Sequence, residues 1–198
     1  MCGIVGYIGE REAQQVLLQG LKRLEYRGYD SAGVLVFDGT RFQRVRCEGK
    51  LGELEKRLQS HPVHGHVGIG HTRWATHGVP SERNAHPHLV AGVSIVHNGI
   101  IENSYELKEE LIREGAIFES ETDSEVVAHL ISKELKTEHD LETAVLKVIP
   151  RLEGAYAILV AWEKEPETLV AFKHGPPLVL GVGKQEMFVA SDIQALLP

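Results

Sequence analysis

The sequence has few cysteines, few aromatic residues and no long apolar run. Cys2 and Cys47 are the only cysteines among its 198 residues, and two thiols cannot build the disulfide framework of a small secreted domain. No basic stretch precedes the first apolar segment, and no apolar run approaches the roughly 18 residues that a membrane helix needs. We therefore predict a cytoplasmic protein with no targeting or membrane segment.

The chain also has fewer basic than acidic residues. The chain has 21 Lys and Arg residues against 28 Asp and Glu residues, so its formal net charge is −7. An acidic chain of this kind is a poor match for a nucleic-acid-binding surface. Hydrophobic residues at 42% and charged residues at 25% are ordinary for a globular protein and exclude a disordered or fibrous chain. We predict one compact domain with a sizeable core.

Strand signals come first in the chain, helix signals occupy its middle and strand signals return at its end. This order predicts an α+β fold, and the short links between the last strands predict antiparallel pairing among them. Apolar residues at helical spacing mark the helices, and alternating or β-branched runs mark the strands. Helices are expected at 11–26, 50–59, 102–114, 123–136 and 140–150, and strands at 1–9, 32–37, 42–47, 67–70, 93–97, 155–162, 168–173, 178–183 and 187–190.

Residues 61–88 form a long segment with many histidines and little predicted regular structure. Long irregular segments in compact domains are uncommon and are usually functional. His64-x-His66 and His86-Pro87-His88 resemble metal-ligand pairs, but their spacing matches no zinc template and no second cysteine lies nearby. We expect no metal ion and no cofactor.

The position of Cys2 allows two interpretations. In a strand, a cysteine is most often a small apolar core residue. As the residue after the initiator Met1, however, Cys2 gains a free α-amine once Met1 is removed. An α-amine has a pKa of roughly 7.7–8.0, close to the roughly 8.5 of a thiol. Such an amine can act as the general base for its own thiol, so Cys2 is a candidate nucleophile, whereas Cys47 is interpreted as structural.

Asn98-Gly99 follows a strongly apolar predicted strand. Asn-Gly is the strongest short hairpin signal, so a turn is one interpretation. The other is chemical, because a side-chain amide next to an unhindered backbone N–H can bind the oxyanion of a tetrahedral acyl intermediate. The sequence alone leaves both interpretations open.

The segment 71–78 contains a group of side chains that could bind an anion. Arg73 has a planar fork that suits a carboxylate, and Thr76 and His77 could add donors to the same anion. The alternative is a surface loop in which Arg73 is solvated and Trp74 packs on the core.

Asp123 lies just before a predicted helix. The simple interpretation is a helix N-cap, with Thr122 as the rival cap. The functional interpretation is a carboxylate that accepts hydrogen bonds from a substrate ammonium group.

Together these residues resemble the class II glutamine amidotransferases, which are N-terminal nucleophile hydrolases. The Cys-Gly-Ile start is shared by that class, whereas two of the other motifs, residues 23–33 and 71–78, are much more specific to its hexosamine-forming branch. The matching segments are Cys2-Gly3-Ile4-Val5-Gly6, 23–33, 71–78, Asn84-Ala85-His86-Pro87-His88, 97–103 and Ser120-Glu121-Thr122-Asp123.

The resemblance implies a four-layer αββα sandwich with two mainly antiparallel sheets. It also implies the roles of individual residues in the hydrolysis of L-glutamine to glutamate and ammonia. Cys2 would be the nucleophile, Asn98 and the Gly99 backbone the oxyanion hole, and Arg27 and Gly28 the lining beside Cys2. Arg73, Thr76 and His77 would hold the substrate α-carboxylate, Asp123 and the Gly99 carbonyl its α-ammonium, and Trp74 would belong to the loop that closes over the substrate.

The same resemblance implies a larger enzyme around this chain. Residues 1–198 would be a glutaminase domain truncated at its C-terminal end, and covalently linked isomerase domains would bind fructose 6-phosphate and make glucosamine 6-phosphate. The full-length enzyme would be a homodimer with no nucleic-acid or membrane partner. Two alternatives remain open: the glutaminase half of a purine, asparagine or glutamate synthase, or a non-catalytic module whose histidines bind a metal or a partner.

Overall fold

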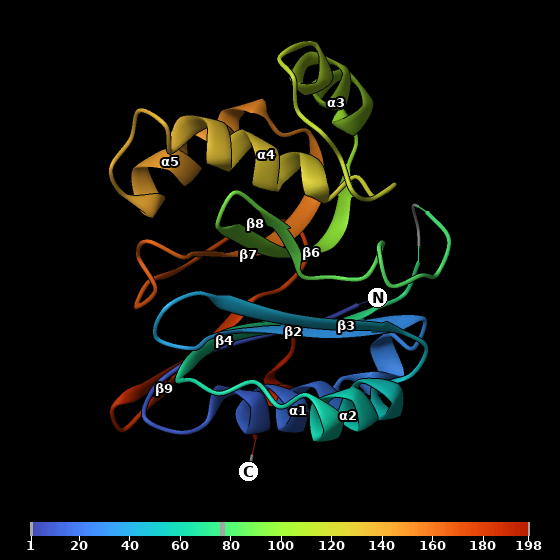
Figure 1. Cartoon of the computed structure of the whole chain (residues 1–198), viewed down its shortest axis with the longest axis vertical. Coiled ribbons are helices and arrows are strands. Elements are labelled where there is room, and N and C mark those ends of the chain that lie inside the picture. The colour runs from blue at the N-terminus through green and yellow to red at the C-terminus, as the bar shows by residue number, and fades with distance from the viewer. Residues whose placement is uncertain (1, 76–77, 198) are drawn as a thin grey trace.

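Two β-sheets lie face to face between two layers of helices (Figure 1). The computed structural model describes residues 2–75 and 78–197. Helices α1 (Ala13–Arg23) and α2 (Leu51–Ser60) cover the outer face of one sheet. Helices α4 (Glu125–Glu134) and α5 (Leu141–Val148) cover the outer face of the other, with α3 (Ser104–Arg113) packed beside α4. The four-layer αββα sandwich implied by the resemblance is therefore confirmed.

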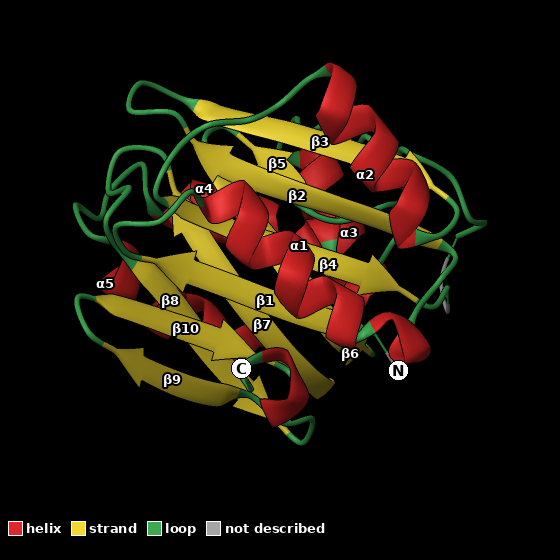
Figure 2. Ribbon diagram, turned by 90° about the horizontal axis from the view of Figure 1, so that it is seen from below, coloured by secondary structure: helices red, strands yellow, loops and turns green. Residues whose placement is uncertain are grey.

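The larger sheet has six antiparallel strands in the order β3-β2-β4-β1-β10-β9, and the smaller sheet has four in the order β5-β6-β7-β8. Figure 2 shows α1 lying across the central strands of the larger sheet. The larger sheet consists of β1 (Gly3–Ile8), β2 (Ser31–Phe37), β3 (Phe42–Glu48), β4 (Val67–Arg73), β9 (Val179–Gly183) and β10 (Glu186–Ala190). The smaller consists of β5 (His88–Val90), β6 (Val93–Ile101), β7 (Gly154–Trp162) and β8 (Leu169–His174).

Each helix presents one apolar stripe to its sheet. In α1, the residues Val16, Leu17, Gly20 and Leu21 are buried, and they form the stripe that the helical spacing predicts. The helices are α1 (Ala13–Arg23), α2 (Leu51–Ser60), α3 (Ser104–Arg113), α4 (Glu125–Glu134) and α5 (Leu141–Val148), with short 3₁₀ helices at Glu25–Arg27, Ile149–Arg151 and Ile193–Ala195. Among the described residues, none of these helices has the length and apolar character needed to cross a lipid bilayer.

Alternation along the strands divides the apolar side chains into three clusters. In β1, Ile4 points into the layer between the two sheets, whereas Val5 and Tyr7 point toward α1 and α2. Residues two apart on a strand share a face. Cys2 therefore comes to the inner layer, at the end of the apolar cluster that contains Ile4.

Two predictions about strands are wrong. β6 does not end at Asn98-Gly99 but continues to Ile101, because both residues pair with β7 opposite Ala157 and Tyr156. The hairpin-turn interpretation of this dipeptide is thus excluded. The antiparallel pairing expected among the last strands holds for β7 with β8 and for β9 with β10, but not between the two pairs, since β8 belongs to the smaller sheet and β9 to the larger. The link between them contains Pro176-Pro177, and proline cannot donate to a sheet ladder.

Glu125 anchors the loop that precedes α4. Its side chain is buried, and its carboxylate accepts hydrogen bonds from the backbone N–H groups of Glu119 and Ser120 at 2.8 and 2.6 Å. Burial alone raises the pKa of Glu125, but contact with His129 and these hydrogen bonds lower it to about 2. The loop held in this way carries Asp123.

We expect Glu125→Gln to lower the free energy of unfolding by about 1.5–3 kcal/mol at pH 7, because hydrogen bonds to a charged group are lost. The folded-state pKa of Glu125 lies below its ordinary value of 4.5. Its stabilisation is therefore present above pH 4.5 and is lost as the pH falls toward 2. Urea unfolding at several pH values measures the difference. Glu142→Gln, in the exposed first turn of α5, is the matched control, and an equal loss at every pH would contradict the assignment.

Candidate active site

Polar side chains replace apolar ones at one end of the layer between the sheets. Ile69 of β4 belongs to the inner apolar cluster, so His71 and Arg73 of the same strand point to the same layer. Val96 of β6 also belongs to this cluster, which directs Asn98 toward β1 and β4 from the opposite sheet. Four polar groups therefore converge from both sheets: the thiol of Cys2, the imidazole of His71, the guanidinium of Arg73 and the amide of Asn98.

A pocket of about 350 Å³ opens at this end, within the usual volume range for small-molecule sites. Gly28 does not face it: a Cβ added there would lie 2.8 Å from the carbonyl oxygen of Thr72, so glycine allows close packing against β4. Thr76 and His77 lie outside the described residues. The predicted site residues that line the pocket are Cys2, Arg27, Arg73, Trp74, Asn98, Gly99 and Asp123, joined by others that include Pro176 and Pro177.

The thiol of Cys2 lies against the backbone that follows β4. The amide N–H of Trp74 donates a hydrogen bond to Sγ at 3.1 Å. Burial raises the pKa of the Cys2 thiol, although the Trp74 amide and the charge of Arg73 oppose this rise. The thiol is therefore protonated at neutral pH, and a reaction that uses it as a nucleophile needs a base.

Asn98 bridges the two sheets beside Cys2. Its Nδ2 donates a hydrogen bond to the carbonyl oxygen of Cys2 at 2.9 Å, across 96 residues of sequence. The next residue, Gly99, has a φ of +124°, and a Cβ there would lie 2.0 Å from the carbonyl oxygen of Ala155. Only glycine fits this position. Gly99 itself is exposed to solvent beside the Asn98 amide.

Arg73 and Asp123 provide opposite charges at the same pocket. Arg73 is buried at the end of β4 and donates to the carbonyl oxygen of Gly78 at 3.3 Å. Burial lowers the pKa of Arg73, and the charges of Cys2 and Asp123 act in the opposite direction. A guanidinium remains charged under these conditions. The pocket can therefore hold a molecule that carries both an anionic and a cationic group.

The N-cap interpretation of Asp123 is wrong. Ser124 occupies the N-cap position of α4, and the Asp123 carboxylate accepts a hydrogen bond from the backbone N–H of Ile101 at 2.9 Å. The rival cap, Thr122, has its hydroxyl 3.0 Å from Nε2 of His88. The bond to Ile101 fixes Asp123 to the end of β6, close to Gly99, with its carboxylate on the pocket wall.

Arg27 is buried beside the pocket in the short 3₁₀ helix after α1. Its Nη1 forms an ion pair with Oδ2 of Asp192 at 2.7 Å. The same nitrogen donates to the carbonyl oxygen of Ser191 at 3.4 Å. These contacts join the segment before β2 to the segment after β10.

Sequence reasoning missed three groups that hold the site in place. Asp30 accepts a hydrogen bond from the backbone N–H of Ala75 at 2.7 Å and so holds the residue after Trp74 in place. Asp192 pairs with Arg27. His71 contacts Asn98. Of these, His71 shares a face of β4 with Arg73, but the strand expected at 67–70 ended before both residues, whereas β4 continues to Arg73.

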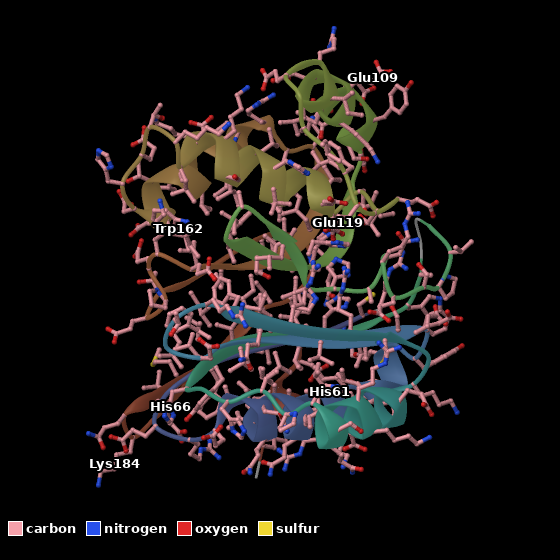
Figure 3. The ribbon with its side chains drawn as sticks, viewed as in Figure 1. His61, His66, Glu109, Glu119, Trp162 and Lys184 are labelled. Atoms are coloured by element: carbon pink, nitrogen blue, oxygen red, sulfur yellow. The ribbon has the colours of Figure 1, made fainter. Side chains whose placement is uncertain are left out.

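The histidines of residues 61–88 that the structure describes are either exposed or buried. His61, His64 and His66 are exposed, and Figure 3 places His61 and His66 in the layer of α1 and α2. His86 and His88 are buried near the pocket, with their rings 4.4 Å apart between centroids. Within residues 2–75 and 78–197, no three His, Cys, Asp or Glu side chains form a group that could hold a metal ion.

The fold and the grouping of these residues define a class II amidotransferase of the N-terminal nucleophile type. Comparisons with known proteins agree. A family model described as a glutamine amidotransferase domain matches residues 71–198. The chain belongs to the glutamine amidotransferase family.

The chain is similar to several longer proteins. Glutamine–fructose-6-phosphate aminotransferase (isomerizing) from Rhizobium meliloti (strain 1021) is 54% identical over 198 residues, which are 100% of this chain and 33% of the relative. The enzyme of that name from Escherichia coli (strain K12) is also 54% identical over 199 residues, with the same coverage. The chain thus spans about a third of the length of these relatives.

The chain is also similar to the solved structure of another amidotransferase. Glutamine phosphoribosylpyrophosphate amidotransferase from B. subtilis, complexed with ADP and GMP, superposes with a TM-score of 0.85 at 31% identity. The match covers 98% of this chain and 43% of that chain.

Proposed function

We propose that this chain hydrolyses L-glutamine to glutamate and ammonia with Cys2 as the nucleophile. The observation that carries the proposal is the hydrogen bond from Asn98 Nδ2 to the Cys2 carbonyl oxygen. It sets an amide donor from one sheet beside the thiol-bearing residue of the other, in a pocket that also contains Arg73 and Asp123. Acyl transfer from the side-chain amide of glutamine uses a thiol nucleophile and an amide donor for the oxyanion. The opposite-charge pair matches the α-carboxylate and α-ammonium of the same molecule.

The proposed reaction begins after removal of Met1. The α-amine of Cys2 takes the thiol proton, and Sγ attacks the side-chain amide carbon of glutamine. Asn98 Nδ2 and the Gly99 N–H stabilise the oxyanion of the tetrahedral intermediate. The protonated amine gives its proton to the departing nitrogen, and ammonia leaves. Water then attacks the γ-glutamyl thioester, which releases glutamate and restores the thiol.

An amine base suits the surroundings of Cys2. Burial keeps the thiol protonated at neutral pH, and a free α-amine has an ordinary pKa of roughly 7.7–8.0. The buried imidazole of His71 is directed to Asn98 and the His97 carbonyl. Burial lowers its pKa to about 3, far from the value that suits a general base near neutral pH.

Substrate recognition is proposed to use both charges of the glutamine α-carbon. Arg73, together with Thr76 and His77, would bind the α-carboxylate, and Asp123 with the Gly99 carbonyl would bind the α-ammonium. Trp74, which is 46% exposed at the pocket mouth, would belong to the loop that closes over the substrate. Arg27 would line the pocket beside Cys2, and Gly28 would support the wall behind it.

A glutamate-release assay tests this function, with L-glutamine as substrate. We expect activity in the unaltered protein and a KM raised about 10- to 100-fold in Asp123→Asn, since a charge-assisted contact is lost. Asparagine keeps an oxygen that can accept from Ile101 N–H, so the fold around β6 is preserved. Asp140→Asn, at the N-cap of α5, changes the same charge elsewhere. Absence of glutamate in the unaltered protein would overturn the proposed function, and an unchanged KM in Asp123→Asn would overturn the role of Asp123.

We further propose that residues 1–198 are the ammonia-supplying domain of a cytoplasmic, homodimeric enzyme that makes glucosamine 6-phosphate. The similarity to two aminotransferases of about three times this length supports linked isomerase domains that bind fructose 6-phosphate. A second candidate, the glutaminase half of a purine-forming amidotransferase, draws support from the B. subtilis structure. Supplying fructose 6-phosphate or phosphoribosylpyrophosphate to the whole protein, and assaying the aminated sugar phosphate, distinguishes the two.

A further inference from the structure

A buried histidine of β4 lies directly behind the proposed oxyanion hole. His71 is 0% exposed, and its ring lies against that of His86, with the centroids 4.3 Å apart and the planes tilted by 34°. Its Nε2 lies 3.0 Å from the carbonyl oxygen of His97 and 3.0 Å from Oδ1 of Asn98. The proposed reaction gives this side chain no step of its own.

The hydrogen-bond partners of His71 determine which of its nitrogens carries the proton. A backbone carbonyl can only accept a hydrogen bond, so the His97 carbonyl requires a proton on Nε2 of His71. The atom of Asn98 that faces this N–H must then be an acceptor, which is the amide oxygen. On the other side of Asn98, the carbonyl of Cys2 requires a donor. Both neighbours therefore fix the same orientation of the Asn98 amide.

We propose that His71 is a positioning residue that holds the Asn98 amide with its NH₂ group directed toward Cys2. This inference rests on the proposed glutaminase function, because Asn98 acts on an oxyanion only if that function is correct. Without the Nε2–H donor, the amide loses one of the two contacts that favour this orientation and keeps only the bond to the Cys2 carbonyl. The reversed amide would present an oxygen to the oxyanion, and two oxygens that face each other are repulsive.

The ring remains neutral while it performs this task. Burial lowers the pKa of His71 to about 3, although the contacts with Asn98 and His97 act in the opposite direction. The N–H of Nε2 is thus present throughout the pH range in which a thiol nucleophile operates. Because the ring is neutral, it adds no positive charge beside Cys2. A positive charge there would stabilise the thiolate in the ground state.

Three variants of His71 separate positioning from packing. In His71→Gln, the side-chain amide can place an N–H donor near the former Nε2. His71→Met has the same length without a donor, and His71→Asn carries its donor closer to the backbone, near the former Nδ1. We expect kcat for glutamine hydrolysis to fall about 10- to 100-fold in His71→Met and His71→Asn, with KM within about twofold and substantial rescue in His71→Gln. Arg73 and Asp123 bind the other end of the substrate, which is why KM is spared.

A double substitution tests whether His71 acts through Asn98. We expect His71→Met to lower kcat less than about threefold in a protein that already carries Asn98→Ala, because the group that it positions is gone. Equal losses in both backgrounds, equal kcat in His71→Gln and His71→Met, or a loss confined to KM would each overturn the proposal. If the unaltered protein makes no glutamate, the failure belongs to the proposed function instead.

Nuclear magnetic resonance provides a test that needs no substitution of His71. In the unaltered protein, ¹⁵N-resolved spectra of the imidazole are expected to show the Nε2–H tautomer of His71 from pH 6 to pH 8. A proton on Nδ1 would overturn the proposal, since Nε2 could not then donate to Asn98.

Discussion

Replacement of Cys2 by alanine is expected to reduce glutamate formation from L-glutamine by about 10⁴-fold or more, because loss of a catalytic nucleophile has effects of this size. The covalent route through a thioester is then closed, and Asn98 has no tetrahedral intermediate to stabilise. KM is not the informative quantity here, since Arg73 and Asp123 remain in place. Single-turnover and steady-state assays of glutamate release measure the loss.

Cys47→Ala is the matched control for this substitution. Cys47 is 1% exposed and belongs to the apolar cluster beneath α1 and α2, on the opposite side of the larger sheet from the pocket. We expect this variant to keep the kcat and KM of the unaltered protein. Undiminished activity in Cys2→Ala, or loss of activity only in Cys47→Ala, would contradict the assignment of the nucleophile.

Asn98→Ala is expected to lower kcat by about 10²–10³-fold, which corresponds to about 2.7–4 kcal/mol of transition-state stabilisation. Its Nδ2 is the side-chain donor directed at Cys2, and the Gly99 N–H alone would remain to stabilise the oxyanion. Because the interaction is strongest in the transition state, KM should change little. Initial-rate kinetics over a range of glutamine concentrations separate the two constants.

Asn98→Asp is the isosteric partner of Asn98→Ala. It keeps an oxygen that can accept the hydrogen bond from His71 but replaces the NH₂ donor with a second oxygen, so negative charge would face the developing oxyanion. We expect this variant to be at least as slow as Asn98→Ala. A rise in KM with kcat unchanged in both variants would show that Asn98 binds the ground state and does not form the oxyanion hole.

The fold could be predicted from the sequence to the extent that local signals determine it. The apolar stripe of α1 and the strand at β1 each require only a few neighbouring residues. The structure has both, with Ile4 of β1 facing one apolar cluster and Val5 and Tyr7 facing another. The division of the last strands between two sheets could not be predicted in the same way. That division depends on packing in the layer between the sheets, where β7 and β8 meet β1 and β4, rather than on the length of the link at Pro176-Pro177.

Local sequence signals predicted even less of how the site residues come together. Cys2, Asn98 and Asp123 were singled out for their residue types, but their nearness depends on contacts such as Asn98 Nδ2 to the Cys2 carbonyl, 96 residues apart in sequence. No local pattern encodes a distance of that kind. Local preferences favoured a hairpin at Asn98-Gly99 and an N-cap at Asp123. Both were wrong because turn and cap preferences do not account for hydrogen bonds to strands that are distant in sequence.

His71 was missed for a related reason. A histidine in a histidine-rich segment attracts a metal-ligand interpretation, whereas its observed contacts are a backbone carbonyl and an amide on another strand. The strand expected at 67–70 ended before His71, whereas β4 continues to Arg73, so the face that His71 shares with Arg73 was not predicted. The groups that His71 contacts lie on β6 of the opposite sheet, which no local pattern places there.

The central claim is that Cys2, freed of Met1, is the residue that attacks glutamine. Its most direct test is mass spectrometry of the N-terminal peptide after reaction with a chloroketone analogue of L-glutamine, which alkylates a thiol nucleophile. We predict a peptide that begins at Cys2 and carries one equivalent of label, with Cys47 unlabelled and the labelled protein inactive. Label on Cys47, or active protein in which Met1 still precedes Cys2, would contradict the claim.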